Sequence, residues 1–290
     1  MTTSDQPHAD HPHPDHDRGL EFDVATLLGR RRALGLLGGV GLAAFAGCSG
    51  TGTSNPGTTG ATTGTSTGTP TSPTATGSGS TVSTEIPDET GGPFPGDGSN
   101  GVNVLDDSGI VRSDLTSSFG TSTTRAEGVP LTVNLTVTDS ANGYAAMPGA
   151  AVYLWHCDRD GNYSMYSRGV EDENYLRGVQ PTSDDGTATF TTIFPAAYSG
   201  RWPHIHFEVY RSTDEATSSG QIVKTSQLAL PQAVCEAVYA TPGYEQSVAN
   251  LAGTSLSSDI VFRDDGAVHQ LATVTGDVTS GYTANLTIGV

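Results

Sequence analysis

Apolar and polar residues alternate along most of the chain from residue 85 to residue 290. These stretches are rich in Thr, Val and aromatic residues, Gly, Asp and Asn interrupt them, and no apolar stripe with the helical period runs through them. Because successive side chains of a strand point to opposite faces of its sheet, this alternation predicts half-buried strands. The eight predicted strands cover residues 131–138, 150–156, 186–193, 205–211, 226–230, 260–262, 268–275 and 283–290.

Turn sequences separate several of these strands. Asn142-Gly143, Asp160-Gly161 and Asp185-Gly186 each favour a tight turn, because glycine adopts positive φ without steric cost. Short strands spread over about 200 residues fit one domain of two packed sheets better than two small domains. We therefore expect residues 85–290 to form an all-β domain, a two-sheet β-sandwich with few helices.

The first 48 residues have the character of an export signal. Residues 1–29 are polar, residues 30–32 are all arginine, and residues 33–46 are apolar and rich in glycine. The apolar stretch is shorter than the ~20 residues of a membrane helix, and its glycines argue against a buried helix with a free thiol. Arginines before such a stretch, with small residues directly before Cys48, resemble a twin-arginine signal with a lipobox. We expect an extracytoplasmic protein, exported by a twin-arginine-type route and anchored to the cell surface through a lipid on Cys48.

Residues 49–84 consist almost entirely of Gly, Ser, Thr, Pro and Ala. Such a composition offers too little apolar surface to offset the entropy of ordering, so we expect a disordered tether. The net charge of −18 argues against nucleic acid and anionic lipid as direct partners, which leaves the lipid anchor as the contact with the membrane. Outside the cytoplasm, the remaining cysteines Cys157 and Cys235 are a candidate disulfide, although their spacing alone does not establish the bond.

Two histidines on a predicted strand are the first candidates for chemistry. His204 and His206 are two residues apart, so their imidazoles point to the same face and can reach one metal ion. A His-x-His pair by itself is a weak signal, because such a pair is more often a surface feature or a hydrogen-bonded core pair. Tyr163, Tyr198 and Arg201, which precede the pair along the chain, change this balance.

The segment 148–207 carries a resemblance to a known family. It contains the run Ala-x-Val-x-x-Trp-His-Cys-Asp-x-x-Gly-x-Tyr-Ser from residue 150, then Tyr-Leu-Arg-Gly-Val-Gln from residue 175, Thr-Ile-x-Pro-x-x-Tyr from residue 192 and Arg-x-x-His-x-His-Phe from residue 201. Residues 89–94, 111–114 and 128–131 and the Thr-Ser-Gln-Leu run from residue 225 extend it. Together these motifs resemble the intradiol ring-cleavage dioxygenases, in particular their exported short-loop branch, which is related to catechol 1,2- and protocatechuate 3,4-dioxygenases.

The resemblance implies the β-sandwich of these enzymes and a non-haem Fe(III) ion bound by Tyr163, Tyr198, His204 and His206. The donor chemistry agrees, because phenolate is a hard anionic ligand that suits Fe(III) better than softer metals. The implied partners are a small aromatic diol and O2. The implied reaction cleaves the ring of a catechol between its two hydroxyl-bearing carbons and gives a cis,cis-muconate-type dicarboxylate.

The resemblance also implies catalytic roles for three residues. Tyr198 would act as a base as well as a ligand, Arg201 would stabilise negative charge on the ring, and Gln227 would orient the substrate. Because a polar insertion over residues 212–220 precedes Gln227, Gln221 competes with it for that role.

A further group of residues is expected around the site. Arg177 and Gln180 are candidates for bracing it, and we expect Trp202 at the edge of the pocket. Trp155 is expected in the core, and His156 is interpreted as a hydrogen-bonded strand residue rather than a ligand.

Two readings compete with the enzyme. The first is a non-catalytic surface β-sandwich module that binds iron or aromatic compounds. The second, a zinc hydrolase that uses His204 and His206, lacks a suitably spaced carboxylate base. Nothing in the sequence resembles the helical N-terminal dimerisation domain of the cytoplasmic catechol branch, so the resemblance implies no oligomeric state.

Overall fold

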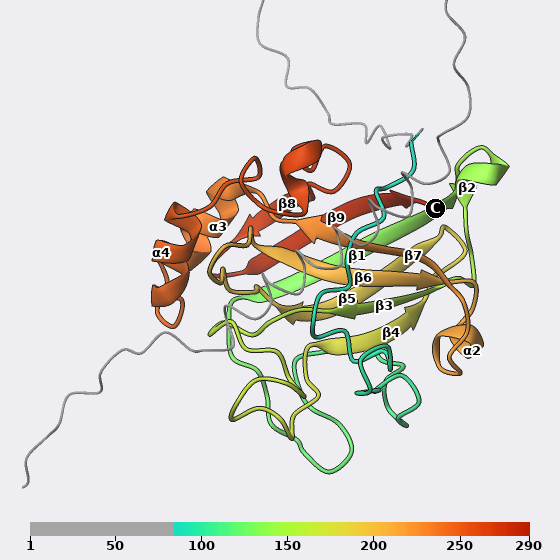
Figure 1. The fold of residues 1–290 in the computed structure, drawn as a ribbon, viewed down its shortest axis with the longest axis horizontal. Helices are drawn as coiled ribbons and strands as arrows, with labels where there is room; N and C mark the ends of the chain where they lie inside the picture. The colour runs from blue at the N-terminus through green and yellow to red at the C-terminus, as the bar shows by residue number, and fades with distance from the viewer. Residues whose placement is uncertain (1–83) are drawn as a thin grey trace, which may run out of the picture.

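Two β-sheets packed face to face make up the part of the chain that the structure describes, residues 84–290 (Figure 1). In this computed structural model one sheet has the order β2-β1-β9-β8, with β5 also paired to β1, and the other has the order β4-β3-β6-β7. The predicted two-sheet β-sandwich is therefore confirmed. The predicted export signal over residues 1–48, its lipidation residue Cys48 and the predicted tether as far as residue 83 lie outside the described residues.

The strands have the following bounds: β1 Pro130–Asp139, β2 Ala145–Ala146, β3 Ala151–Trp155, β4 Arg177–Pro181, β5 Thr187–Ile193, β6 His204–Tyr210, β7 Ile222–Ala229, β8 Thr273–Asp277 and β9 Gly281–Gly289. Short helices lie at the ends of the sandwich, with α3 (Gln232–Tyr239) and α4 (Glu245–Ala252) at one end and α2 (Thr213–Ala216) at the other (Figure 1). Two 3-10 turns, η1 (Ser140–Asn142) and η2 (Phe262–Asp264), complete the elements. None of the helices in this part of the chain is long and apolar enough to cross a membrane.

Strand β1 illustrates how the sequence pattern builds the core. Its apolar residues alternate with polar ones, and Leu131, Val133, Leu135 and Val137 are all buried between the two sheets. The side chains between them, Thr132, Asn134 and Thr136, are only partly buried. This is the half-buried strand that the alternation predicts.

Strand β6 differs from β1 because both of its faces are buried. Ile205, Phe207 and Val209 pack into the core between the sheets, whereas His204, His206 and Glu208 lie on the other face and are also buried. The segment from Thr84 onward, drawn in teal in Figure 1, covers this outer face. Its contacts include the Glu89 amide, which donates to Thr225 of β7, and the Pro95 carbonyl, which accepts from Tyr153 of β3. Loops thus cover the outer face of this sheet and bury its polar side chains.

The predicted strands differ from the observed ones at the C-terminal part of the chain. Segment 260–262 is not a strand, because the Asp259 side chain accepts hydrogen bonds from the Val261 and Phe262 amides and starts the η2 turn. Segment 268–275 becomes a strand only at Thr273. Strand β4 and helices α3 and α4 were not predicted. The two helices have eight residues each, too few for the helical period to emerge from the surrounding pattern.

The candidate disulfide is a further difference, because Cys157 and Cys235 are both free and buried. Cys157 follows β3 on the loop-covered side of the four-stranded sheet, and its thiol approaches the Ala196 carbonyl at 3.7 Å. Cys235 lies on α3 and belongs to the cluster between the sheets. The two thiols therefore sit in different hydrophobic clusters, where burial raises the pKa of each.

Candidate metal centre

Four side chains converge beneath the loops that cover β6. The Tyr163 and Tyr198 hydroxyls are 3.4 Å apart, the Tyr198 hydroxyl is 3.1 Å from His204 Nε2, and His204 Nε2 is 3.1 Å from His206 Nε2. All four residues are at least nine-tenths buried. The structure thus brings together the four residues that the sequence predicts as iron ligands.

One strand and two loops position the four residues. His204 and His206 alternate with core residues on β6, so the strand itself holds both imidazoles on one face. Tyr198 lies in the loop that connects β5 to β6, and Tyr163 lies in the loop that follows β3. The antiparallel pairing of β3 with β6, in which Trp155 is opposite His206, brings the end of β3 next to the histidines.

Burial sets the protonation of the cluster. It lowers the pKa of both histidines well below 6.5, with the neighbouring His204 and Arg201 adding to the effect on His206, so both imidazoles are neutral at pH 7. The His204 Nδ1 donates to the Trp202 carbonyl at 2.6 Å, which leaves the Nε2 lone pair facing the cluster. Burial and the neighbouring Tyr198 raise the pKa of the Tyr163 phenol well above its ordinary value. Without a cation the tyrosine is therefore a neutral phenol.

The donor set fits a hard cation. Donors bound at right angles to an ion about 2.1 Å away are about 3.0 Å apart, close to the two 3.1 Å separations in the cluster. The buried Nδ1 of His206 has no hydrogen-bond partner among the described residues, so this imidazole is not the satisfied core histidine of the competing interpretation. The described residues contain no group of three His, Cys, Asp or Glu side chains suited to a metal. A cation at this place would therefore depend on the two tyrosines.

Arg201 and Gln227 lie together beside the cluster. Arg201 Nη2 donates to the Gln227 side-chain oxygen at 2.6 Å, and the Gln227 amide donates to the Thr90 carbonyl at 2.9 Å. Gln227 on β7 is directly opposite His206 on β6. Gln221, by contrast, is exposed and precedes β7. The geometry therefore favours Gln227 over Gln221 as the glutamine of the site.

Arg177 braces the loop that carries Tyr163. Its fully buried guanidinium donates to the Ser164 side chain and carbonyl, at 3.0 and 2.9 Å, and to the Pro95 carbonyl and the Tyr153 hydroxyl, at 2.9 and 3.2 Å. These contacts join the residue after Tyr163 to the N-terminal covering segment. Arg177 thus binds the residue that follows Tyr163.

Two residues that were predicted to lie around the site have different positions in the structure. Gln180 is only partly buried, and its amide donates to the Val179 carbonyl, away from the cluster. Trp202 is not at a pocket edge but in the core between the sheets. Its indole N–H donates to the Leu230 carbonyl, so its polar atom has a partner there. Its contribution to the site is the backbone carbonyl that accepts from His204.

Sequence reasoning missed three contributors to the site. Trp155, expected only as a core residue, stacks on His206 with ring centroids 4.9 Å apart. Glu89 and Asp259 are buried carboxyl groups near Arg201, and Asp259 Oδ2 accepts from Arg201 Nε at 3.0 Å. No local signal pointed to Asp259, because it lies 58 residues along the chain from Arg201, just before a segment predicted as a strand.

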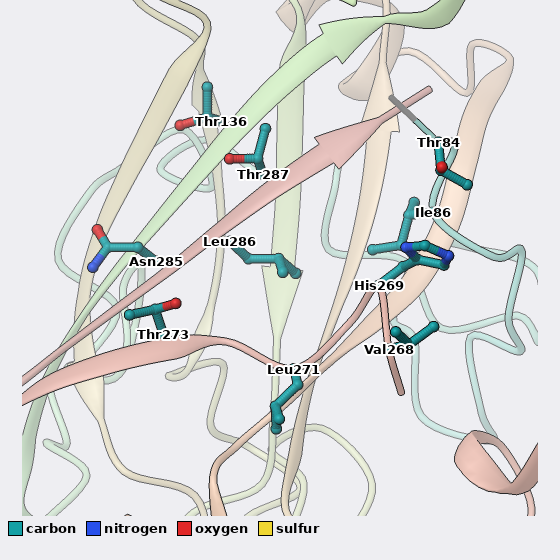
Figure 2. Close-up of a pocket in the computed structure, with 10 residues that line it drawn as sticks. All are labelled: Thr84, Ile86, Thr136, Val268, His269, Leu271, Thr273, Asn285, Leu286 and Thr287. Atoms are coloured by element: carbon teal, nitrogen blue, oxygen red, sulfur yellow. The ribbon is translucent and has the colours of Figure 1, made fainter. Parts of the chain in front are cut away.

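A cavity of about 340 Å³ lies elsewhere, beside strands β8 and β9 (Figure 2). Threonines of β1, β8 and β9 line one side of it, and Val268, His269 and Leu271 line the other. It contains none of the four converging residues. The chemistry of the predicted site is therefore separate from this cavity.

Comparison with known proteins agrees with the geometry. A family model described as Dioxygenase matches residues 111–213. A chlorocatechol 1,2-dioxygenase from Rhodococcus opacus is 40% identical over 50 residues, which cover 17% of this chain and 20% of that enzyme. An intradiol ring-cleavage dioxygenase from Tetranychus urticae has a similar structure, with a TM-score of 0.53 and 23% identity over 63% of this chain and 87% of the other. The resemblance to the intradiol ring-cleavage dioxygenases is therefore confirmed, and the described domain has their fold.

Proposed function

We propose that the protein is a non-haem Fe(III) intradiol dioxygenase. It would use O2 to cleave a small catechol-type ring between the two hydroxyl-bearing carbons and release a cis,cis-muconate-type dicarboxylate. The observation that carries the proposal is the convergence of two phenols and two imidazoles, with separations of 3.1 to 3.4 Å, in a buried site of an intradiol dioxygenase fold.

Tyr163, Tyr198, His204 and His206 would hold the iron. When bound, Fe(III) would stabilise the phenolate forms of the tyrosines and activate a chelated catechol toward O2. The neutral imidazoles already present lone pairs, so the protein has only to give up the phenol protons when the ion binds. The strand-borne histidines provide the rigid half of the site.

Tyr198 is the residue we assign as base. It lies in a loop rather than on a strand, and at 8% exposure it is the most accessible of the four residues. Its phenolate oxygen would accept a proton from one catechol hydroxyl as the diol enters. Arg201 would then face negative charge on the ring, and Gln227, held by Arg201 and Thr90, would orient the diol.

Visible absorption and oxygen uptake test this proposal together. Protein loaded with Fe(III) is expected to absorb visible light through its tyrosinate ligands and to consume O2 when catechol is added. Tyr163→Phe should remove much of the colour and the activity. Tyr166→Phe is the matched control, because Tyr166 is in the same loop but its hydroxyl contacts Asn100 and the Gly96 amide.

The outcomes separate the proposal from its rivals. Colourless protein that takes up no Fe(III) would contradict both the enzyme and an iron-binding module. A coloured catechol complex that consumes no O2 would favour the non-catalytic module. A panel of catechol, protocatechuate, hydroxyquinol and alkyl-substituted catechols then identifies the ring that is accepted.

We also propose that the enzyme acts outside the cytoplasm. Residues 1–48 would direct twin-arginine-type export, Cys48 would carry the lipid, and residues 49–84 would tether the domain over residues 85–290 to the cell surface. Replacing the three arginines at 30–32 by lysine should retain the protein in the cytoplasm, and Cys48→Ser should release it from the membrane fraction. Unchanged fractionation of both variants would contradict the proposed export and lipid anchoring.

A further inference from the structure

Asp259 is a fully buried carboxylate on the segment that follows α4. Its Oδ2 accepts from Arg201 Nε at 3.0 Å and from the Trp202 amide at 2.6 Å. Its Oδ1 accepts from the Val261 and Phe262 amides at 2.8 and 3.1 Å. Each oxygen thus receives two N–H donors, which a single carboxylate can satisfy and an amide cannot.

Three of the groups that Asp259 binds, Arg201, Trp202 and Phe262, lie beside the candidate metal centre. The other end of the Arg201 guanidinium donates to Gln227, opposite His206. The carbonyl of Trp202 accepts from His204 Nδ1, and the ring of Phe262 lies 6.5 Å from the His204 ring. One side chain therefore connects the arginine, the backbone before His204 and an aromatic neighbour of that imidazole.

Two buried carboxyl groups lie near Arg201, and they differ in protonation. Arg201 and Asp259 are exposed by only 1% and 0%, so their ion pair is shielded from water. Glu89 also lies near Arg201, but burial and the neighbouring Asp264 raise its pKa to about 8. At pH 7 Glu89 is therefore mostly a neutral acid, and the carboxylate of Asp259 fixes the position of the arginine.

We propose that Asp259 is a positioning residue of the candidate site, which acts by holding the Arg201 guanidinium toward Gln227 and the Trp202 peptide toward His204. Its effect on turnover rests on the proposed function. The hydrogen-bond network itself does not.

Asp259→Asn tests the inference, because it keeps the size of the side chain but turns an NH2 group toward two N–H donors. The iron ligands are untouched, so the iron-loaded variant should keep its visible colour. With Arg201 displaced, kcat for catechol should fall about 10- to 100-fold. The affinity for catechol, measured without O2 from the change in the visible band, should change less than kcat. Asp107→Asn makes the same charge change at an exposed position and should match the wild type.

A double-mutant cycle shows whether Asp259 acts through Arg201. In an Arg201→Gln background, Asp259→Asn should lower kcat by less than about 3-fold, because the guanidinium that Asp259 positions is already gone and only its contact with the Trp202 backbone remains to be lost. Equal losses in the two backgrounds, or an Asp259→Asn variant within about 2-fold of wild type, would overturn the inference.

The same double-mutant cycle still tests the inference if the single variant Asp259→Asn does not fold. Removing both charges of a buried pair is better tolerated than removing one, so the double variant is expected to fold with the kcat of Arg201→Gln. A double variant that also fails to fold would assign Asp259 a purely structural role and overturn the inference. Wild-type protein without colour or O2 uptake would instead refute the proposed function, which keeps the two failures apart.

Discussion

Arg177→Met is expected to destabilise the domain and to loosen the candidate metal centre, although the four hydrogen bonds of Arg177 go to none of the four residues of the centre. Methionine retains the apolar stem but removes the four hydrogen bonds to Ser164, Pro95 and Tyr153. The Pro95 carbonyl still accepts from the Tyr153 hydroxyl, whereas the Ser164 carbonyl loses its guanidinium donor. The damage is therefore concentrated on the residue next to Tyr163.

The magnitude follows from the burial of these groups. A hydrogen bond to a charged group contributes about 1.5–3 kcal/mol, and a buried acceptor left unpaired costs about 1–3 kcal/mol. The described contacts of Arg177 include no carboxylate, so its removal also recovers part of the cost of burying a charge. A net loss of about 2–4 kcal/mol is expected, a large share of the ~5–15 kcal/mol that stabilises a typical domain.

Urea unfolding of the iron-free domain measures this loss, as a fall of about 1 M or more in the midpoint. The iron-loaded variant should also lose part of its visible band, because Tyr163 is no longer held. Arg125→Met is the control, since the Arg125 side chain is 64% exposed and its ion pair with Asp114 contributes at most ~1 kcal/mol. If Arg177→Met lowers the midpoint no more than Arg125→Met, the bracing role assigned to Arg177 is wrong.

Three further predictions concern pH, the pocket glutamine and the cysteines. Burial raises the pKa of Glu89 and Glu208 to about 8. Because the folded state then binds more protons than the unfolded state, the unfolding midpoint should fall as pH rises from 6.5 to 8, and Glu208→Gln should reduce this slope. Gln227→Ala should lower kcat at least ~10-fold whereas Gln221→Ala should leave it unchanged, and O2-uptake assays that rank the two variants the other way would reverse the assignment. Since both cysteines are free, a thiol reductant should not change the thermal midpoint, and a clear decrease would indicate a disulfide after all.

The strands that the sequence predicted correctly are those with one face in the core. β1, β5 and β9 have strong period-two alternation, because one side of each meets the other sheet and the opposite side meets polar surroundings. The pattern did not predict β4 or the short helices, because β4 is largely buried and the helices are too short to show a helical period. Local pattern is therefore informative where one environment extends along a whole element.

The four predicted ligands could be found from the sequence because each lies in a motif that resembles a known family, and two share a strand face. Gln227 could not be separated from Gln221 in this way. The insertion before β7 obscured the register, and only the pairing of Gln227 with His206 across two strands favours Gln227. Trp202 was misplaced because its sequence gives no sign of the Leu230 carbonyl that holds its indole in the core.

The sequence by itself determined the fold class, the resemblance to the intradiol dioxygenases and the donor types available for a metal, since all of these follow from residue identity and local spacing. Only the tertiary structure decided which distant groups complete the site. Asp259 meets Arg201, and Arg177 meets Pro95, because folding closes long loops and brings unrelated segments over β6. A buried charge is costly unless groups of opposite charge or hydrogen-bonding groups surround it. Folding can bring such groups from any part of the chain, however distant they are in the sequence.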